Sequence, residues 1–228
     1  MKRYVILVAG GSGSRMGVSL PKQFLSLAGK PILIHTLERF LEYSPDLQVI
    51  LCLPADQFSY WEQLRKEYPL PFSQPIIETP GGATRFQSVR NGLQQVTTDG
   101  LVAVHDGVRP LVPVSVIARS FEVAAESGTA IAAVAAKDSI RLVTEDAGNS
   151  ALDRSKLRLV QTPQTFQVSL LKKAFEQAES PLFTDDASVA EAAGYPIHLL
   201  EGSYENIKIT TPEDLAFAEA LLKGSSLA

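Results

Sequence analysis

The sequence predicts an α/β fold, a Rossmann-like and mostly parallel sheet with helices on both faces. Short runs rich in apolar and β-branched residues alternate with longer segments whose apolar residues recur at helical spacing. Alternation of this kind is typical of parallel strands joined by crossover helices. The chain has 228 residues, 45% of them hydrophobic and 20% charged, which favours one large core and a single domain, residues 1–228.

Six runs are expected to form strands of this sheet. Each is short and apolar, as strands buried on both faces usually are. They are Tyr4–Ala9, Gln48–Leu53, Pro75–Glu78, Leu101–His105, Thr129–Ala135 and Ile197–Leu200.

Helices are expected between these strands. Pro31 can occupy the first position of one whose apolar face is formed by Leu33, Leu37, Phe40 and Leu41. Further helices are expected at Asp56–Tyr68, Arg85–Val96, Pro113–Glu126, Val168–Gln177 and Asp185–Ala193. Thr211 and Pro212 open the last helix as N-cap and first residue. Its inward face is expected to comprise Leu215, Phe217, Ala218, Leu221 and Leu222.

One stretch, residues 137–161, breaks the alternation. Two β-like pieces, Ser139–Thr144 and Leu157–Gln161, flank the polar insert "EDAGNSALDRSK" with no helical pattern between them. We interpret this stretch, called the arm below, as a β-hairpin that projects from the domain. A two-stranded hairpin is marginal alone in water, so we expect the arm to pack on a second copy and make a homodimer; the alternative is a surface loop.

Composition excludes several classes of protein. The net charge of −4 leaves no basic surface for nucleic acid. Cys52 is the single cysteine and lies in an apolar run, which predicts a buried thiol and excludes disulfides and cysteine-rich zinc sites. No apolar run approaches the ~20 residues of a membrane span, and the start lacks the apolar core of a signal peptide. We therefore expect a cytoplasmic protein without a membrane partner.

The stretch "VAGGSGSRMGVSLPKQF", Val8 to Phe24, has the composition of a phosphate-binding loop. It does not fit the dinucleotide fingerprint, because Met16 stands where the third glycine should be. A P-loop would need Lys followed by Ser or Thr after its last glycine, and the chain instead has Arg15 within the loop and Lys22 after it. A glycine turn with two cations suits a nucleoside triphosphate.

Three other stretches are predicted to meet this loop at the carboxyl ends of the strands. "TPGGATRFQSV" offers close backbone approach before a helix, with donors from Arg85 and Ser88, or is an ordinary turn with a solvated arginine. "VHDGVRP" places Asp106 after a strand, where it could pair with Arg109, cap a helix, or hold a ribose hydroxyl or magnesium. "ENIKIT" places Lys208 within a short strand, as a functional cation or a solvated edge residue.

These motifs together carry a family resemblance that spans nearly the whole chain. The quoted stretches, with "DRSKLRLVQTPQTF" and "TDDASVAEAAG", are similar to those of 2-C-methyl-D-erythritol 4-phosphate cytidylyltransferases. Such enzymes join CTP to a branched sugar-alcohol phosphate in non-mevalonate isoprenoid biosynthesis. The resemblance implies the same fold, a homodimer and a divalent cation such as Mg²⁺.

The resemblance also implies a role for particular residues of this chain. The catalytic cations are expected to be Arg15, Lys22, Arg154 and Lys208. CTP is expected to be bound by Ala9, Gly10, Gly11, Gly13, Gly82, Ala83, Ser88, Asp106 and Gly107. The acceptor phosphate is expected to be held by Asp106, Thr184 and Lys208, with Ser139 and Arg154 from the arm of the other subunit. Thr162 lies in a family motif without an assigned role.

Four positions depart from the family pattern. Gly10 stands where a second Ala is common, and Gly107 also replaces an Ala. Ala83 stands where some members have Asp, which weakens any claim that a side chain there recognises the cytosine amino group. Ser139 in place of Thr keeps the hydroxyl.

The chemistry of nucleotidyl transfer agrees with this set of residues. In-line attack concentrates negative charge on the α-phosphorus, and positioned cations stabilise it. The attacking group is already a phosphate anion and needs no general base, which accounts for a chain whose three histidines form no catalytic triad. A structural hydrogen bond is the expected role of His105.

Three alternatives remain from the sequence alone. A ribitol 5-phosphate cytidylyltransferase would share the fold and the first motifs, although "DRSKLRLVQTPQ" and "TDDAS" favour methylerythritol phosphate. A non-catalytic nucleotide-binding regulator would bind CTP without releasing pyrophosphate, and both Arg15 and Lys22 argue against it. A nicotinamide-dependent oxidoreductase is disfavoured by the glycine spacing.

Overall fold

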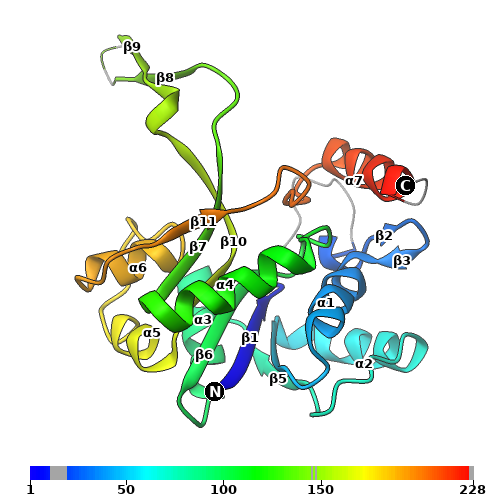
Figure 1. Cartoon of the computed structure of the whole chain (residues 1–228). Coiled ribbons are helices and arrows are strands. Elements are labelled where there is room, and N and C mark those ends of the chain that lie inside the picture. Colours follow the sequence, from blue (N-terminus) through cyan, green and yellow to red (C-terminus); the bar gives the residue numbers. More distant parts are fainter. Residues whose placement is uncertain (11–19, 145, 147, 226–228) are drawn as a thin grey trace.

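The computed structural model describes residues 1–10, 20–144, 146 and 148–225. Its centre is a seven-stranded sheet in the order β11-β7-β10-β6-β1-β4-β5 (Figure 1). The strands are β1 (Lys2–Val8), β4 (Gln48–Leu53), β5 (Ile77–Pro80), β6 (Gly100–Asp106), β7 (Thr129–Ala135), β10 (Arg158–Gln167) and β11 (Leu199–Glu201). Only β10 runs antiparallel to its neighbours, β6 and β7. The predicted mostly parallel α/β sheet is therefore confirmed.

Helices cover both faces of this sheet. On one face α1 (Ile32–Tyr43), α2 (Phe58–Glu67) and α4 (Val114–Ser127) share a buried apolar cluster with the sheet. On the other face a second cluster includes α3 (Arg85–Gln94), α5 (Val168–Ala174) and α6 (Asp186–Ala192). The last helix, α7 (Pro212–Ser225), packs near the short strands β2 (Ser26–Leu27) and β3 (Lys30–Pro31).

The side chains of β1 show that the sheet is buried on both faces. Successive side chains of a strand point to opposite faces. Val5 and Leu7 belong to the first cluster, whereas Tyr4 and Ile6 belong to the second, and all four are buried. A continuous apolar run is what two covered faces require.

The arm differs from its prediction in strand pairing. The strand β8 (Ile140–Val143) pairs antiparallel with β9 (Asn149–Leu152), which lies inside the polar insert. In the predicted partner, Leu157–Gln161, residues 158–161 instead belong to β10, which pairs with β7 of the main sheet. The prediction was wrong because the polar composition of β9, "NSAL", gave no β signal, although an exposed hairpin strand needs no apolar face. Figure 1 shows the hairpin projecting away from the body.

Three other predictions need correction. Pro31 is the N-cap of α1, which begins at Ile32. Phe217 does not pack inward, since 55% of it is exposed, whereas Ala218 of the same helix is buried. Lys208 lies in the loop between β11 and α7 and not in a strand.

Over the part of the chain that the structure describes, α-helices are either too short or too polar to cross a membrane.

Candidate functional site

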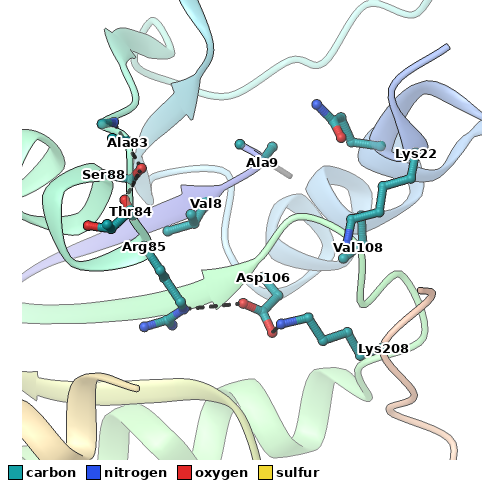
Figure 2. A pocket seen from close by; sticks show the side chains of 13 residues that line it. Val8, Ala9, Lys22, Ala83, Thr84, Arg85, Ser88, Asp106, Val108 and Lys208 are labelled. Atoms are coloured by element: carbon teal, nitrogen blue, oxygen red, sulfur yellow. Dashed lines mark hydrogen bonds and ion pairs between the residues drawn. The ribbon is translucent and has the colours of Figure 1, made fainter. Parts of the chain in front are cut away.

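A cavity of about 200 Å³ opens at the carboxyl ends of β1 and β6, beside the N-terminus of α3 (Figure 2). Parallel pairing brings these elements together, because Val8 of β1 lies opposite both Asp106 of β6 and Cys52 of β4. The described residues that line it are Val8, Ala9, Gly10, Lys22, Gln23, Gly82, Ala83, Thr84, Arg85, Ser88, Asp106, Val108 and Lys208. The predicted CTP-binding residues that the structure describes, other than Gly107, thus surround one space.

Gly107 lies behind this cavity and does not line it. Its N–H donates a hydrogen bond to the Val8 carbonyl at 2.9 Å. A Cβ at this position would come within 2.9 Å of the Ala9 Cβ, which is too close without movement of the chain. Glycine at position 107 is therefore explained by packing, because the ends of β1 and β6 approach each other closely there.

The turn before α3 is held by its own side chains. Thr84 caps the helix by accepting from the Gln87 N–H at 3.1 Å. The Ser88 hydroxyl accepts from the Gly82 N–H at 3.0 Å and donates to the Thr84 carbonyl at 2.9 Å. The Ala83 N–H donates to Gln87 Oε1 at 3.1 Å. Ser88 therefore shapes the turn, and the hydroxyl proton is already used.

Gly82 is required at its position in this turn. A Cβ there would stand 2.2 Å from the Cβ of Gln87, a contact that real side chains do not make. The close approach keeps the backbone of the turn at the edge of the cavity, which it lines.

Asp106 is the centre of a charged cluster. Its Oδ2 lies 3.1 Å from Arg109 Nε and 3.1 Å from Lys208 Nζ, and its Oδ1 lies 3.6 Å from Arg85 Nε. Burial alone would raise the pKa of this carboxyl, but the cations of Arg85, Lys208 and Arg109 outweigh burial and hold the pKa well below its usual range. Asp106 is therefore a carboxylate at any physiological pH.

A second cavity of about 250 Å³ lies on the other side of this cluster. Its lining residues are Arg85, Asp106, Arg109, Val160, Gln161, Thr162, Gln164, Thr184, Asp185 and Lys208. The two cavities share Arg85, Asp106 and Lys208, which we call the shared wall. The three residues predicted to hold the acceptor phosphate within one chain, Asp106, Thr184 and Lys208, line this second cavity together.

His105 has a structural role, as expected. The side chain is fully buried; its Nδ1 lies 3.0 Å from the Thr162 hydroxyl and its Nε2 lies 3.2 Å from the Arg109 carbonyl, both in hydrogen bonds. Burial lowers the pKa of His105 to about 4, although Asp106 opposes this change. The imidazole is therefore neutral at pH 7, and it lines neither of the two cavities.

Thr162 acquires a role that sequence reasoning missed. Its hydroxyl accepts a hydrogen bond from the Asp106 N–H at 3.1 Å, in addition to its contact with His105. Thr162 therefore fixes the backbone from which the Asp106 carboxylate projects. No sequence pattern indicated this contact, because the two residues are 56 positions apart.

Two arginines of the cluster make contacts that the sequence does not predict. Arg109 is predicted to pair with Asp106, and it also donates to the Asn206 carbonyl at 2.8 Å, which connects the loop of Lys208 to the end of β6. For Arg85 the sequence leaves open a solvated side chain, and the structure excludes it, because Arg85 donates to Asp186 at 2.7 Å. The motif "TDDAS" contains Asp186, but nothing in the sequence pairs it with Arg85, 101 positions away.

The remaining predicted residues are not brought to these cavities in the single chain. Ser139 and Arg154 are exposed on the arm, where Arg154 donates to the Lys137 carbonyl. Gly11, Gly13 and Arg15 lie outside the described residues.

Lys208 is held in place without a strand, because the next residue, Ile209, donates its N–H to the Val108 carbonyl at 2.9 Å.

The donor set around Asp106 bears on a divalent cation. Within residues 1–10, 20–144, 146 and 148–225, no group of three or more His, Cys, Asp or Glu side chains could hold a metal alone. Mg²⁺ commonly uses one carboxylate together with substrate phosphates. The residues present therefore fit a magnesium ion that arrives with a nucleotide and not a resident all-protein metal site.

Comparison with known proteins gives a consistent result. The family profile described as 2-C-methyl-D-erythritol 4-phosphate cytidylyltransferase (IspD) matches residues 4–224. The chain is 53% identical over 222 residues to the enzyme of that name from Bacteroides thetaiotaomicron, covering 97% of this chain and 100% of the relative. Identity to the enzyme of the same name from Bacillus velezensis is 42% over 229 residues, 99% of this chain and 98% of the relative.

Solved structures agree with these relatives. The 4-diphosphocytidyl-2C-methyl-D-erythritol synthase of Anaerococcus prevotii superposes with a TM-score of 0.85 at 26% identity, covering 97% of this chain and 96% of that one. The 2-C-methyl-D-erythritol 4-phosphate cytidylyltransferase of Thermus thermophilus gives a TM-score of 0.76 at 32% identity, covering 98% and 100%.

Proposed function

The chain belongs to the 2-C-methyl-D-erythritol 4-phosphate cytidylyltransferase family, and from that premise we propose how its two cavities divide the reaction. The enzyme joins CTP and 2-C-methyl-D-erythritol 4-phosphate to give 4-diphosphocytidyl-2-C-methyl-D-erythritol and pyrophosphate, in non-mevalonate isoprenoid biosynthesis. One observation carries the division of labour. Two cavities of comparable size meet at the charged wall of Arg85, Asp106 and Lys208.

The first cavity is the CTP site. The backbone at Ala9 and Gly10 and the turn at Gly82 and Ala83 line it. The N–H groups of Gly82 and Ala83 already donate to Ser88 and Gln87, so this turn offers the nucleotide close approach and not free N–H donors. Backbone groups approach phosphate and base closely without bulky side chains in the way. Gly11 and Gly13 continue the same loop in the sequence and have the same proposed role.

The second cavity receives the acceptor phosphate. Thr184 and Lys208 line it with Asp106, and Lys208 supplies a cation that Asp106 holds in position at 3.1 Å. The acceptor phosphate would then face the α-phosphate of CTP across the shared wall. Holding two anions in line at contact distance is the main contribution that such a site makes to the rate.

Cations on the CTP side stabilise the charge that develops during transfer. Lys22 lines the first cavity, and Figure 2 shows its side chain extending toward Val108. Arg15 is the second proposed cation. Neither needs to move a proton, because the acceptor phosphate is an anion that attacks without a base. A magnesium ion bound with the nucleotide would neutralise the leaving pyrophosphate, and Asp106 is the candidate carboxylate for it, directly or through water.

The arm completes the acceptor site of a second copy. Ser139 and Arg154 are exposed on a hairpin that projects from the body, so in a homodimer they can reach the second cavity of the partner. Three exposed apolar residues of the β8–β9 hairpin, Leu142, Val143 and Leu152, would be covered by the same contact. Arg154 would then be the fourth catalytic cation.

An assay with two acceptors tests the function. The purified chain is incubated with CTP, Mg²⁺ and either methylerythritol phosphate or ribitol 5-phosphate, and the products are followed by pyrophosphate release and phosphorus NMR. We expect a diphosphate diester with methylerythritol phosphate. Preference for ribitol phosphate would identify the related enzyme, and CTP binding without pyrophosphate release would identify a regulator.

A further inference from the structure

We propose that Arg85 is an additional substrate-contacting residue, whose guanidinium binds phosphate oxygens at the shared wall, and that Asp186 is the positioning residue that aims it. The proposal rests on the function given above, which brings two phosphate groups to this wall.

Arg85 is part of the shared wall, which both substrates approach in the proposed function. It begins α3 on the rim of the first cavity, and it also lines the second. In Figure 2 its guanidinium lies below the Ser88 turn and points toward Asp106. A side chain that faces two cavities can contact the α-phosphate of CTP, the acceptor phosphate, or both.

The guanidinium has unused hydrogen-bond donors. Arginine has five N–H donors, and one of them, on Nη2, has an acceptor among the described residues, Asp186 Oδ2 at 2.7 Å. The Nε atom lies 3.6 Å from Asp106, which is an ion pair but too long for a hydrogen bond. The side chain retains 26% exposure. Guanidinium donors that face a cavity match phosphate oxygens in geometry and charge.

The charges that line the two cavities also favour an anion. Among the described lining residues, the first cavity has the cations Lys22, Arg85 and Lys208 and the carboxylate Asp106. The second has the cations Arg85, Arg109 and Lys208 and the carboxylates Asp106 and Asp185, so cations outnumber carboxylates in both. A bound phosphate group would offset this excess of positive charge.

Asp186 is built to hold Arg85 and little else. The side chain is fully buried at the first position of α6, and its Oδ1 has no hydrogen-bond partner among the described residues. Burial raises its pKa even though Arg85 opposes this change. A buried carboxylate with one oxygen unpaired is costly for folding. Orienting a partner would offset this cost, and the partner that Asp186 contacts is Arg85.

Three variants test the proposal. Arg85→Gln removes the charge, Asp186→Asn removes the anchor, and Arg90→Gln is the matched control, because Arg90 lies on the same helix over the Phe86 ring and lines neither cavity. We expect Arg85→Gln to lower kcat/KM by ~10²-fold, Asp186→Asn by ~10-fold, and Arg90→Gln to leave it unchanged. Thermal unfolding of each variant checks that the fold is retained.

Separate titrations identify which phosphate Arg85 contacts. A rise in KM for CTP alone assigns the α-phosphate, a rise in KM for methylerythritol phosphate alone assigns the acceptor, and a fall in kcat with both KM values unchanged assigns a contact made in the transition state. Each of these results supports the proposal. Wild-type values of kcat and both KM values in Arg85→Gln would overturn it.

Chemical rescue distinguishes contact with substrate from support of the fold. Guanidinium ion at millimolar concentration should restore part of the turnover of Arg85→Ala, because a free guanidinium can occupy the same position beside the phosphates. Urea at the same concentration should restore none. A folded Arg85→Ala enzyme with low turnover and equal responses to guanidinium and urea would assign a structural role and overturn the proposal. The wild-type assay stands apart, since pyrophosphate release by the wild-type enzyme establishes the function whatever the variants do.

Discussion

The shared wall and the arm carry charged residues of similar kinds in opposite physical settings. At the wall, Asp106 is almost completely buried and is held by three cations and by the Thr162 hydroxyl. On the arm, all of β9 and most of β8 are exposed, and Arg154 bonds to a neighbouring carbonyl of the same arm. The wall is therefore fixed in the single chain, whereas the arm is not.

This difference separates two ways of building a site. A buried charge network is arranged before substrate binds, so its groups do not need to reorganise during the reaction. An exposed hairpin can supply residues to a neighbouring molecule, but the hairpin itself is only marginally stable until it packs against that neighbour. We therefore expect substitutions in the body to act on one chain alone, and substitutions on the arm to act through the assembly.

The largest expected difference is in folding stability. Phe166 is fully buried near the end of β10, between β6 and β7, and Phe166→Ala should lower the free energy of unfolding by about 4 kcal/mol at any protein concentration. Val143 of the arm is mostly exposed, and Val143→Ala should cost less than about 0.5 kcal/mol in dilute protein. Denaturant unfolding at two protein concentrations measures both. A concentration-independent loss of several kcal/mol in Val143→Ala would show that the arm is part of the core.

The second effect concerns pH. His105 has a pKa lowered from 6.5 to about 4 in the folded chain. Between these two values the unfolded chain binds the extra proton, so stability should fall by up to about 3 kcal/mol as pH decreases from about 6.5 to about 4. His105→Gln should flatten this part of the curve relative to the wild type. Equal slopes in the two proteins would contradict the buried, neutral imidazole.

Sequence reasoning located the wall better than the arm for a physical reason. Parallel strands end at one edge of a sheet, so an Asp after one strand and glycines after another are predicted to meet, and Val8 and Asp106 do lie opposite each other. The contacts that fix the wall come from residues far apart in sequence. Arg85 and Asp186 are 101 positions apart, and local pattern cannot pair them.

The arm shows the opposite limit. Strand β9, Asn149–Leu152, is exposed and mostly polar, so it gave no β signal, and the apolar segment Leu157–Gln161 was predicted as the partner of β8 in its place. The prediction for α7 was wrong at Phe217, because helical spacing places this side chain on the inward face although it is exposed. Periodicity predicts which residues are apolar together and not which face is covered.

The third effect concerns catalysis in the body. Lys22→Ala should lower kcat by ~10²-fold or more, since a positioned cation is lost from the first cavity, and Arg15→Ala should do the same. Lys66→Ala, an exposed lysine on α2, is the control. Steady-state kinetics with folded variants measures the effect. Normal turnover in Lys22→Ala would remove Lys22 from the proposed mechanism.

The smallest expected effect is on the arm, and it separates the two regions most clearly. Arg154→Ala should raise KM for methylerythritol phosphate by ~10-fold with little change for CTP, as the loss of one phosphate contact would do. Lys156→Ala, two residues further along and also exposed, is the control. If the arm acts on a partner, mixing Lys22→Ala with Arg154→Ala subunits should make roughly a quarter of all active sites fully intact. About half of the dimers are then mixed, and in each of them one of the two sites combines an unaltered body with an unaltered arm. No recovery after verified subunit exchange would mean that Arg154 does not serve the partner's site, and equal rises in both KM values would mean that it does not hold the acceptor.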